Sequence, residues 1–215
     1  MSRARDLSAE FVAAGDPTGW FEKLYEEGEA GDSVVPWVQG FPSPSLVEWA
    51  SGLDGGGRSA LVVGCGTGED AEFLATLGFA VSGFDLAPTA IAAAKRMHAG
   101  TGVDYRVADL LALPDAWAGA FDLVFEAYTV QPLFGEVRAR ALDALAGPVA
   151  PGGTLLVVSF ATTEEIPYRD PAMMPWPLTR AEIDRAGGPL ATVRVEYSEG
   201  GQPFLPRWRA EFRRD

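Results

Sequence analysis

The feature that most constrains the fold is a glycine-rich turn, Val63-Gly64-Cys65-Gly66-Thr67-Gly68, which directly follows the apolar run Ser59–Val63. A short apolar run that ends in glycines is typical of a strand buried on both faces, as in a parallel sheet. Glycines let the backbone turn tightly and approach a ligand without a clash at Cβ. The turn therefore predicts a buried strand whose carboxyl end forms part of a ligand site.

Strand-like and helix-like segments then alternate along the chain. The patterns predict parallel strands over residues 59–63, 80–84, 103–107, 121–125 and 154–160, and helices over 69–77, 89–98 and 136–145. Two further strand-like runs, 191–197 and 204–212, are separated by a Ser-Glu-Gly-Gly turn and predict a closing antiparallel hairpin. Because strands that alternate with helices build a parallel sheet covered on both faces, we expect an α/β, Rossmann-like sheet of seven strands, mostly parallel.

The segments outside this alternation differ in character. Helices are predicted over Leu7–Ala14, Trp20–Glu27 and Ser45–Ser51 before the core, and over Thr179–Arg185 after it. Residues 33–45 and 161–177 are rich in proline, and we expect an extended segment and a lid, respectively. A chain of 215 residues suits one α/β domain. We expect one domain over residues 1–215: an N-terminal cap (1–54), a ligand-binding core (55–160), and the lid with the closing hairpin (161–215).

Composition excludes several classes of function. The formal net charge of −13 disfavours nucleic acid as a partner. No apolar stretch is long enough to span a membrane, and the N-terminus lacks the pattern of a targeting peptide, so we expect a cytoplasmic protein. The only cysteine is Cys65, which argues against disulfides and a cysteine-based metal site. We expect a small-molecule substrate and no metal, whereas the sequence does not indicate the oligomeric state.

The spacing of the glycines bears on which ligand the turn binds. It is G-x-G-x-G, whereas a dinucleotide fingerprint, G-x-G-x-x-G, would need glycine at position 69, where this chain has Glu69. A carboxylate at a helix N-terminus also competes with pyrophosphate for the positive end of the helix dipole. The turn thus favours a ligand without phosphate. Two alternatives stay open: a nicotinamide-dependent oxidoreductase and a noncatalytic cofactor-binding protein.

Two acidic residues follow predicted strands. Asp85 ends the second strand and is followed by Leu86, and an acid at this position can accept hydrogen bonds from both hydroxyls of a ribose. Asp109 ends the third strand, where its carboxylate could accept from an adenine amino group while Leu110 packs on the ring. Together with the glycine turn, these residues predict a site for an adenosine-containing ligand.

Five motifs in order resemble those of class I S-adenosylmethionine-dependent methyltransferases: Leu61-Val-Val-Gly-Cys-Gly-Thr-Gly68, Val81-Ser-Gly-Phe-Asp85, Ala108-Asp-Leu110, Phe121-Asp-Leu-Val124 and Ala150-Pro-Gly-Gly-Thr-Leu155. The segments 31–37 and 40–44 further resemble the thiopurine and halide methyltransferase-like branch. One departure is Val62, which stands where many class I enzymes have an acid two residues before the first glycine.

The resemblance implies S-adenosylmethionine as cofactor, S-adenosylhomocysteine as product, and methyl transfer to a small soft nucleophile such as a thiol, halide or heterocycle. Tyr128 would position the acceptor, and no single side chain would be an indispensable base. Residues implied in cofactor binding are Trp37, Gly64, Cys65, Gly66, Gly68, Asp85, Leu86, Asp109, Leu110 and Glu126. Residues implied in the substrate pocket are Trp20, Phe41, Tyr128 and Trp176.

Overall fold

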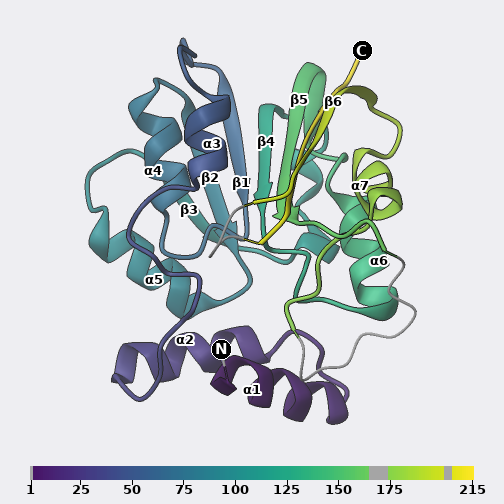
Figure 1. The fold of residues 1–215 in the computed structure, drawn as a ribbon. Coiled ribbons are helices and arrows are strands. Elements are labelled where there is room, and N and C mark those ends of the chain that lie inside the picture. The colour runs from purple at the N-terminus through teal and green to yellow at the C-terminus, as the bar shows by residue number, and fades with distance from the viewer. Residues whose placement is uncertain (1, 165–173, 201–204) are drawn as a thin grey trace.

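The computed structural model describes residues 2–164, 174–200 and 205–215, and within these ranges seven strands form one sheet in the order β3-β2-β1-β4-β5-β7-β6 (Figure 1). Neighbouring strands from β1 to β5 run parallel, whereas β7 is antiparallel to both β5 and β6. This confirms the predicted mostly parallel sheet with a C-terminal hairpin. The strands are β1 (Ser59–Val63), β2 (Ala80–Asp85), β3 (Asp104–Val107), β4 (Phe121–Ala127), β5 (Val149–Phe160), β6 (Ala191–Ser198) and β7 (Arg207–Arg213).

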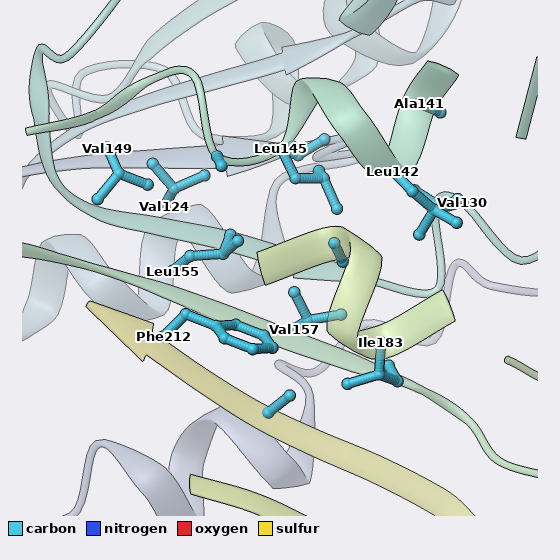
Figure 2. Close-up of a cluster of buried hydrophobic side chains, with 14 of the residues drawn as sticks. Val124, Val130, Ala141, Leu142, Leu145, Val149, Leu155, Val157, Ile183 and Phe212 are labelled. Atoms are coloured by element: carbon cyan, nitrogen blue, oxygen red, sulfur yellow. The ribbon is translucent and has the colours of Figure 1, made fainter. Parts of the chain in front are cut away.

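Helices cover both faces of the sheet, because its strands have apolar side chains on both faces and these must be buried. One face packs against α3 (Pro44–Trp49), α4 (Glu69–Thr76) and α5 (Pro88–Met97). The other packs against α6 (Gly135–Ala144) and α7 (Arg180–Gly187), and Figure 2 shows the apolar side chains of β4, β5 and β7 meeting these two helices. Two short 3₁₀ helices, Leu110–Ala112 and Asp115–Trp117, precede β4.

Two N-terminal helices, α1 (Ser2–Ala13) and α2 (Trp20–Ala30), lie at the end of the sheet toward which the parallel strands point (Figure 1). Their apolar side chains share a small core with Met174 and Trp176. From α2, the Glu22 carboxylate also reaches α5. It accepts hydrogen bonds from the backbone amide (3.1 Å) and the hydroxyl (2.6 Å) of Thr89, in the first turn of that helix. A carboxylate there also suits the helix dipole. The N-terminal helices thus lie over the carboxyl edge of the parallel strands.

The largest boundary differences have tertiary causes. Strand β5 begins at Val149 instead of residue 154, because Val149 pairs with Phe121 of β4. The predicted Pro-Gly-Gly turn is paired as well, since Arg214 donates its amide to the Gly153 carbonyl at 3.0 Å. Helix α1 begins at Ser2 instead of Leu7, because Arg3 and Arg5 hold its first turn through Glu27 and the Met174 carbonyl.

Parts of two further predictions cannot be followed in the structure. Most of the predicted lid (residues 165–173) and the first predicted residue of the last strand (204) lie outside the described residues. Among the described helices, none has the length and apolar character needed to cross a bilayer.

Candidate functional site

The glycine turn connects β1 to α4 with three left-handed backbone conformations, at Gly64 (φ 59°), Gly66 (φ 53°) and Gly68 (φ 100°). Such φ values are readily adopted only by glycine. A Cβ at Gly64 would also collide with the Thr129 side chain, and one at Gly66 would lie 2.9 Å from the Tyr25 hydroxyl. The turn therefore needs glycines both for its own path and for the residues packed over it.

Asp85 stands at the carboxyl end of β2, and its two carboxylate oxygens fasten neighbouring segments together. Oδ2 accepts from the Gly66 amide at 3.0 Å, and Oδ1 accepts from the Ala87 amide at 2.9 Å, with the Leu86 amide also contributing. Burial raises the pKa of the Asp85 carboxyl, and these amides oppose that rise. Because a carboxylate offers about four acceptor positions, the three amides leave capacity for a ribose hydroxyl.

Asp109 has the structural role that acids often have at a helix start. It is the N-cap of the 3₁₀ helix Leu110–Ala112, and its Oδ1 accepts from the Leu111 amide at 2.8 Å. Leu110 is partly buried against the core on the α6 side. The assignment of these two residues to an adenine ring stays a prediction.

Glu126 organises the turn after β4. Its side chain is 1% exposed, and Oε1 accepts from the amides of Thr129 (2.7 Å) and Val130 (3.1 Å). Burial raises the pKa of the Glu126 carboxyl to about 7, opposed by these two amides and by the charge of Arg138. The second oxygen, Oε2, is enclosed without a hydrogen-bond partner among the described residues. Glu126 is thus a buried acid with one oxygen committed and one unsatisfied.

The same turn places Tyr128 in a left-handed conformation, with φ 61°, which is rare for a bulky residue. Its ring lies 5.1 Å from that of Phe160 at the end of β5, and its hydroxyl contacts the guanidinium of Arg207 at the start of β7. The ends of β4, β5 and β7 therefore bring an aromatic pair and a cation together at the carboxyl edge of the parallel strands.

The predicted aromatic residues separate into two groups. Trp20 and Trp176 are 0% and 3% exposed and belong to the small core of the N-terminal cap. Trp37 and Phe41 are 37% and 53% exposed, and Trp37 donates its indole Nε1–H to the Tyr25 hydroxyl at 2.8 Å. The rings of Trp20 and Trp37 nevertheless meet edge to face, with centroids 6.0 Å apart. The place of Trp20, Phe41 and Trp176 in a substrate pocket stays a prediction, as does the contact of Trp37 with the cofactor.

The remaining polar candidates have structural partners. Cys65 is buried within the turn, and burial together with the nearby Asp85 charge raises the pKa of its thiol well above the ordinary value. The Nε2 of His98, the only histidine, lies 3.0 Å from the Thr67 carbonyl. Glu69 at the start of α4 accepts from the Thr67 hydroxyl at 2.8 Å. These contacts give Cys65 and His98 structural roles around the turn, and contact of Cys65 with the cofactor stays a prediction.

Sequence reasoning missed three residues at this edge. Tyr25 belongs to the apolar face of α2, which indicates only packing, and the oxygen of its hydroxyl faces the glycine turn. Thr129 donates its hydroxyl to the Val63 carbonyl at 3.1 Å and so closes the β4 turn over β1. Arg207 belongs to a strand that alternates basic and apolar residues, a pattern that predicts a solvated face.

Comparisons with known proteins bear on the family. Residues 60–153 match a sequence family described as a methyltransferase domain. A probable thiol methyltransferase 2 from Arabidopsis thaliana is 30% identical over 177 residues, which are 76% of this chain and 71% of that protein. A ubiquinone biosynthesis O-methyltransferase from Xanthomonas axonopodis pv. citri (strain 306) is 33% identical over 126 residues, 56% of this chain, and this chain spans only 51% of that relative's length.

Solved structures agree with these matches. One that concerns the conversion of a disulfide bond into a thioacetal group during echinomycin biosynthesis has a TM-score of 0.69 at 27% identity, covering 91% of this chain and 93% of the other. Other structures of the same fold include methyltransferases with bound S-adenosylhomocysteine. The chain belongs to the class I S-adenosylmethionine-dependent methyltransferases.

Proposed function

We propose that this protein transfers the methyl group of S-adenosylmethionine to a small soft nucleophile, which is a thiol, a halide or a heterocycle, and most simply a thiol. The observation on which the proposal depends is the chemistry of the sheet edge at Tyr128. This edge offers an aromatic surface and hydrogen-bond donors, and its acids and thiol are committed or buried.

The residues present fit the cofactor that the family uses. Asp85 has unused acceptor capacity at the end of β2, where a ribose would be bound. The unsatisfied Oε2 of Glu126 is a buried acceptor, and a cationic ammonium would complement its ionised form. When bound, S-adenosylmethionine would supply an electrophilic methyl group on a good leaving group. The protein then has to align the acceptor and exclude water.

Neither Tyr128 nor Cys65 has the environment of a general base. Burial raises the pKa of the Tyr128 hydroxyl, which makes it a poor base at neutral pH. The Cys65 thiol is protonated for the same reason, and we assign the Glu126 carboxyl to the ammonium group of the cofactor. An acceptor that is already nucleophilic, such as a thiolate or halide, needs no such base. An alcohol or phenol depends more strongly on a general base.

Two of the comparisons support sulfur as the accepting atom. The Arabidopsis relative is described as a thiol methyltransferase, and the solved structure at 27% identity concerns a disulfide and a thioacetal. The thiopurine and halide branch suggested by segments 31–37 and 40–44 is part of the same proposal, because its members act on soft nucleophiles.

The proposal is tested with purified protein and methyl-labelled cofactor against thiols, halides, heterocyclic amines and phenols. We expect the highest kcat/KM with a thiol, and calorimetry should show binding of S-adenosylhomocysteine but not of NADH. Tyr128→Phe should retain activity within about a hundredfold, the lower end of what acid-base catalysis contributes. Preference for a phenol, or a ten-thousandfold loss in a folded and cofactor-binding Tyr128→Phe variant, would contradict the proposal.

A further inference from the structure

Tyr25 is a buried residue of α2 whose hydroxyl reaches the glycine turn. Its side chain is 4% exposed, and its ring packs in a small apolar cluster with Ala87 and Ala90, at the start of α5. The hydroxyl oxygen lies 2.9 Å from the position that a Cβ on Gly66 would occupy. Helix α2 thus brings a polar group to the turn that connects β1 to α4.

The Tyr25 hydroxyl has a donor as partner but no acceptor. The Trp37 indole Nε1–H donates to its oxygen at 2.8 Å, so the hydroxyl proton is directed elsewhere. Burial, followed by the nearby Asp85 charge, raises the pKa of Tyr25 well above the ordinary value, so the hydroxyl keeps that proton at neutral pH. No residue within the described ranges of the chain accepts it. A buried donor without an acceptor is unfavourable, and a bound ligand with an acceptor would relieve this cost.

The glycine turn lies between the two acids that we assign to the cofactor. On one side, the Gly66 amide donates to Asp85 at 3.0 Å. On the other side, the Thr129 side chain occupies the space beside Gly64, and the Thr129 amide donates to Glu126 at 2.7 Å. A cofactor that binds one acid through its ribose and the other through its ammonium therefore passes the turn, over which the buried hydroxyl lies.

We infer that the Tyr25 hydroxyl donates a hydrogen bond to the carboxylate of the cofactor's amino acid end. A ribose hydroxyl can itself donate to Asp85, whereas the carboxylate only accepts and therefore needs a donor from the protein. A bond from a hydroxyl to a carboxylate is charge-assisted. A neutral donor also forms no ion pair with Asp85 or Glu126 before the cofactor binds. The inference rests on the cofactor that the proposed function uses, but not on the identity of the methyl acceptor.

Calorimetry with two ligands tests this inference without any methyl acceptor. The ligands are S-adenosylhomocysteine and its decarboxylated form, which keeps the adenosine, the sulfur and the amine. We expect Tyr25→Phe to weaken binding of S-adenosylhomocysteine tenfold or more, the size expected for a lost hydrogen bond to a charged group. The same variant should bind the decarboxylated ligand with unchanged affinity. Wild type should bind the decarboxylated ligand more weakly than S-adenosylhomocysteine, which tests the inference without a substitution.

Tyr105→Phe is the matched control, because Tyr105 is also buried beside the turn but its hydroxyl donates to Glu72 at 2.7 Å. This variant should leave the ratio of the two affinities unchanged. Unchanged binding of S-adenosylhomocysteine by folded Tyr25→Phe, equal weakening of both ligands, or equal affinity of wild type for both would overturn the inference. A protein that methylates phenols in preference to thiols would instead contradict the proposed function and leave the role of Tyr25 intact.

Discussion

Replacing Glu126 by glutamine should change how the stability of the protein depends on pH. Burial raises the pKa of this carboxyl from an ordinary 4.5 to about 7. A folded-state pKa above the unfolded one means that the folded protein holds the proton more tightly between these two values. The contribution of Glu126 to the free energy of unfolding is therefore largest at low pH and is lost as pH rises through 7.

The magnitude follows from the two pKa values. A difference of one pH unit corresponds to about 1.4 kcal/mol, so the stabilisation by the protonated carboxyl falls by about 2.5 kcal/mol between pH 5 and pH 8. Glutamine keeps an oxygen that can accept from the Thr129 and Val130 amides, but it does not titrate. The difference in unfolding free energy between wild type and Glu126→Gln should thus decrease by that amount over this range. Other titrating groups are common to both proteins, so their contributions cancel in the difference.

Urea unfolding of both apo-proteins at several pH values between 5 and 8 measures this difference. Glu136→Gln, an exposed glutamate in the first turn of α6, is the control, and its difference from wild type should stay constant. If the Glu126→Gln difference varied by less than about 0.5 kcal/mol over the range, the buried carboxyl would not have the raised pKa on which the reasoning depends.

Three further predictions concern the cofactor edge. Binding of S-adenosylhomocysteine at pH 7 should release about half a proton if its ammonium pairs with Glu126, whose pKa is about 7, and calorimetry in buffers of different ionisation enthalpy would reveal no release if that pairing is absent. Asp85→Ala should weaken S-adenosylhomocysteine at least tenfold through lost charge-assisted bonds, and unchanged affinity in the folded variant would refute the ribose assignment. Gly64→Ala should lower the melting temperature more than Gly57→Ala, because both positions have positive φ but only Gly64 faces the Thr129 side chain. Equal effects would show that backbone strain alone accounts for the loss of stability.

Local sequence patterns were sufficient to predict the strand at the centre of the sheet. The bounds of β1 were predicted correctly because an apolar run and a glycine turn define them without reference to the rest of the chain. For α7, the capping box formed by Thr179 and Glu182 marks the helix start to within one residue, whereas the helix ends at Gly187, two residues beyond the predicted end. The first turn of α1 and the first residues of β5 depend instead on partners far away in sequence, such as Glu27 and Arg214. No pattern within the segments themselves could have revealed those partners.

Some residues of the candidate site could likewise be predicted from local patterns and others could not. The difference follows from the topology of the sheet. Asp85 could be predicted because a parallel strand that follows a glycine turn ends at the ligand edge by construction. For Arg207 the period of two gives only the strand face, which it shares with Arg209 and Arg213. What distinguishes Arg207 is that β7 is antiparallel to β5, so that its beginning meets the ends of the parallel strands while Arg213 lies at the opposite edge, paired with Thr154. The pairing direction therefore decides which arginine of this alternating strand lies at the carboxyl edge of the parallel strands.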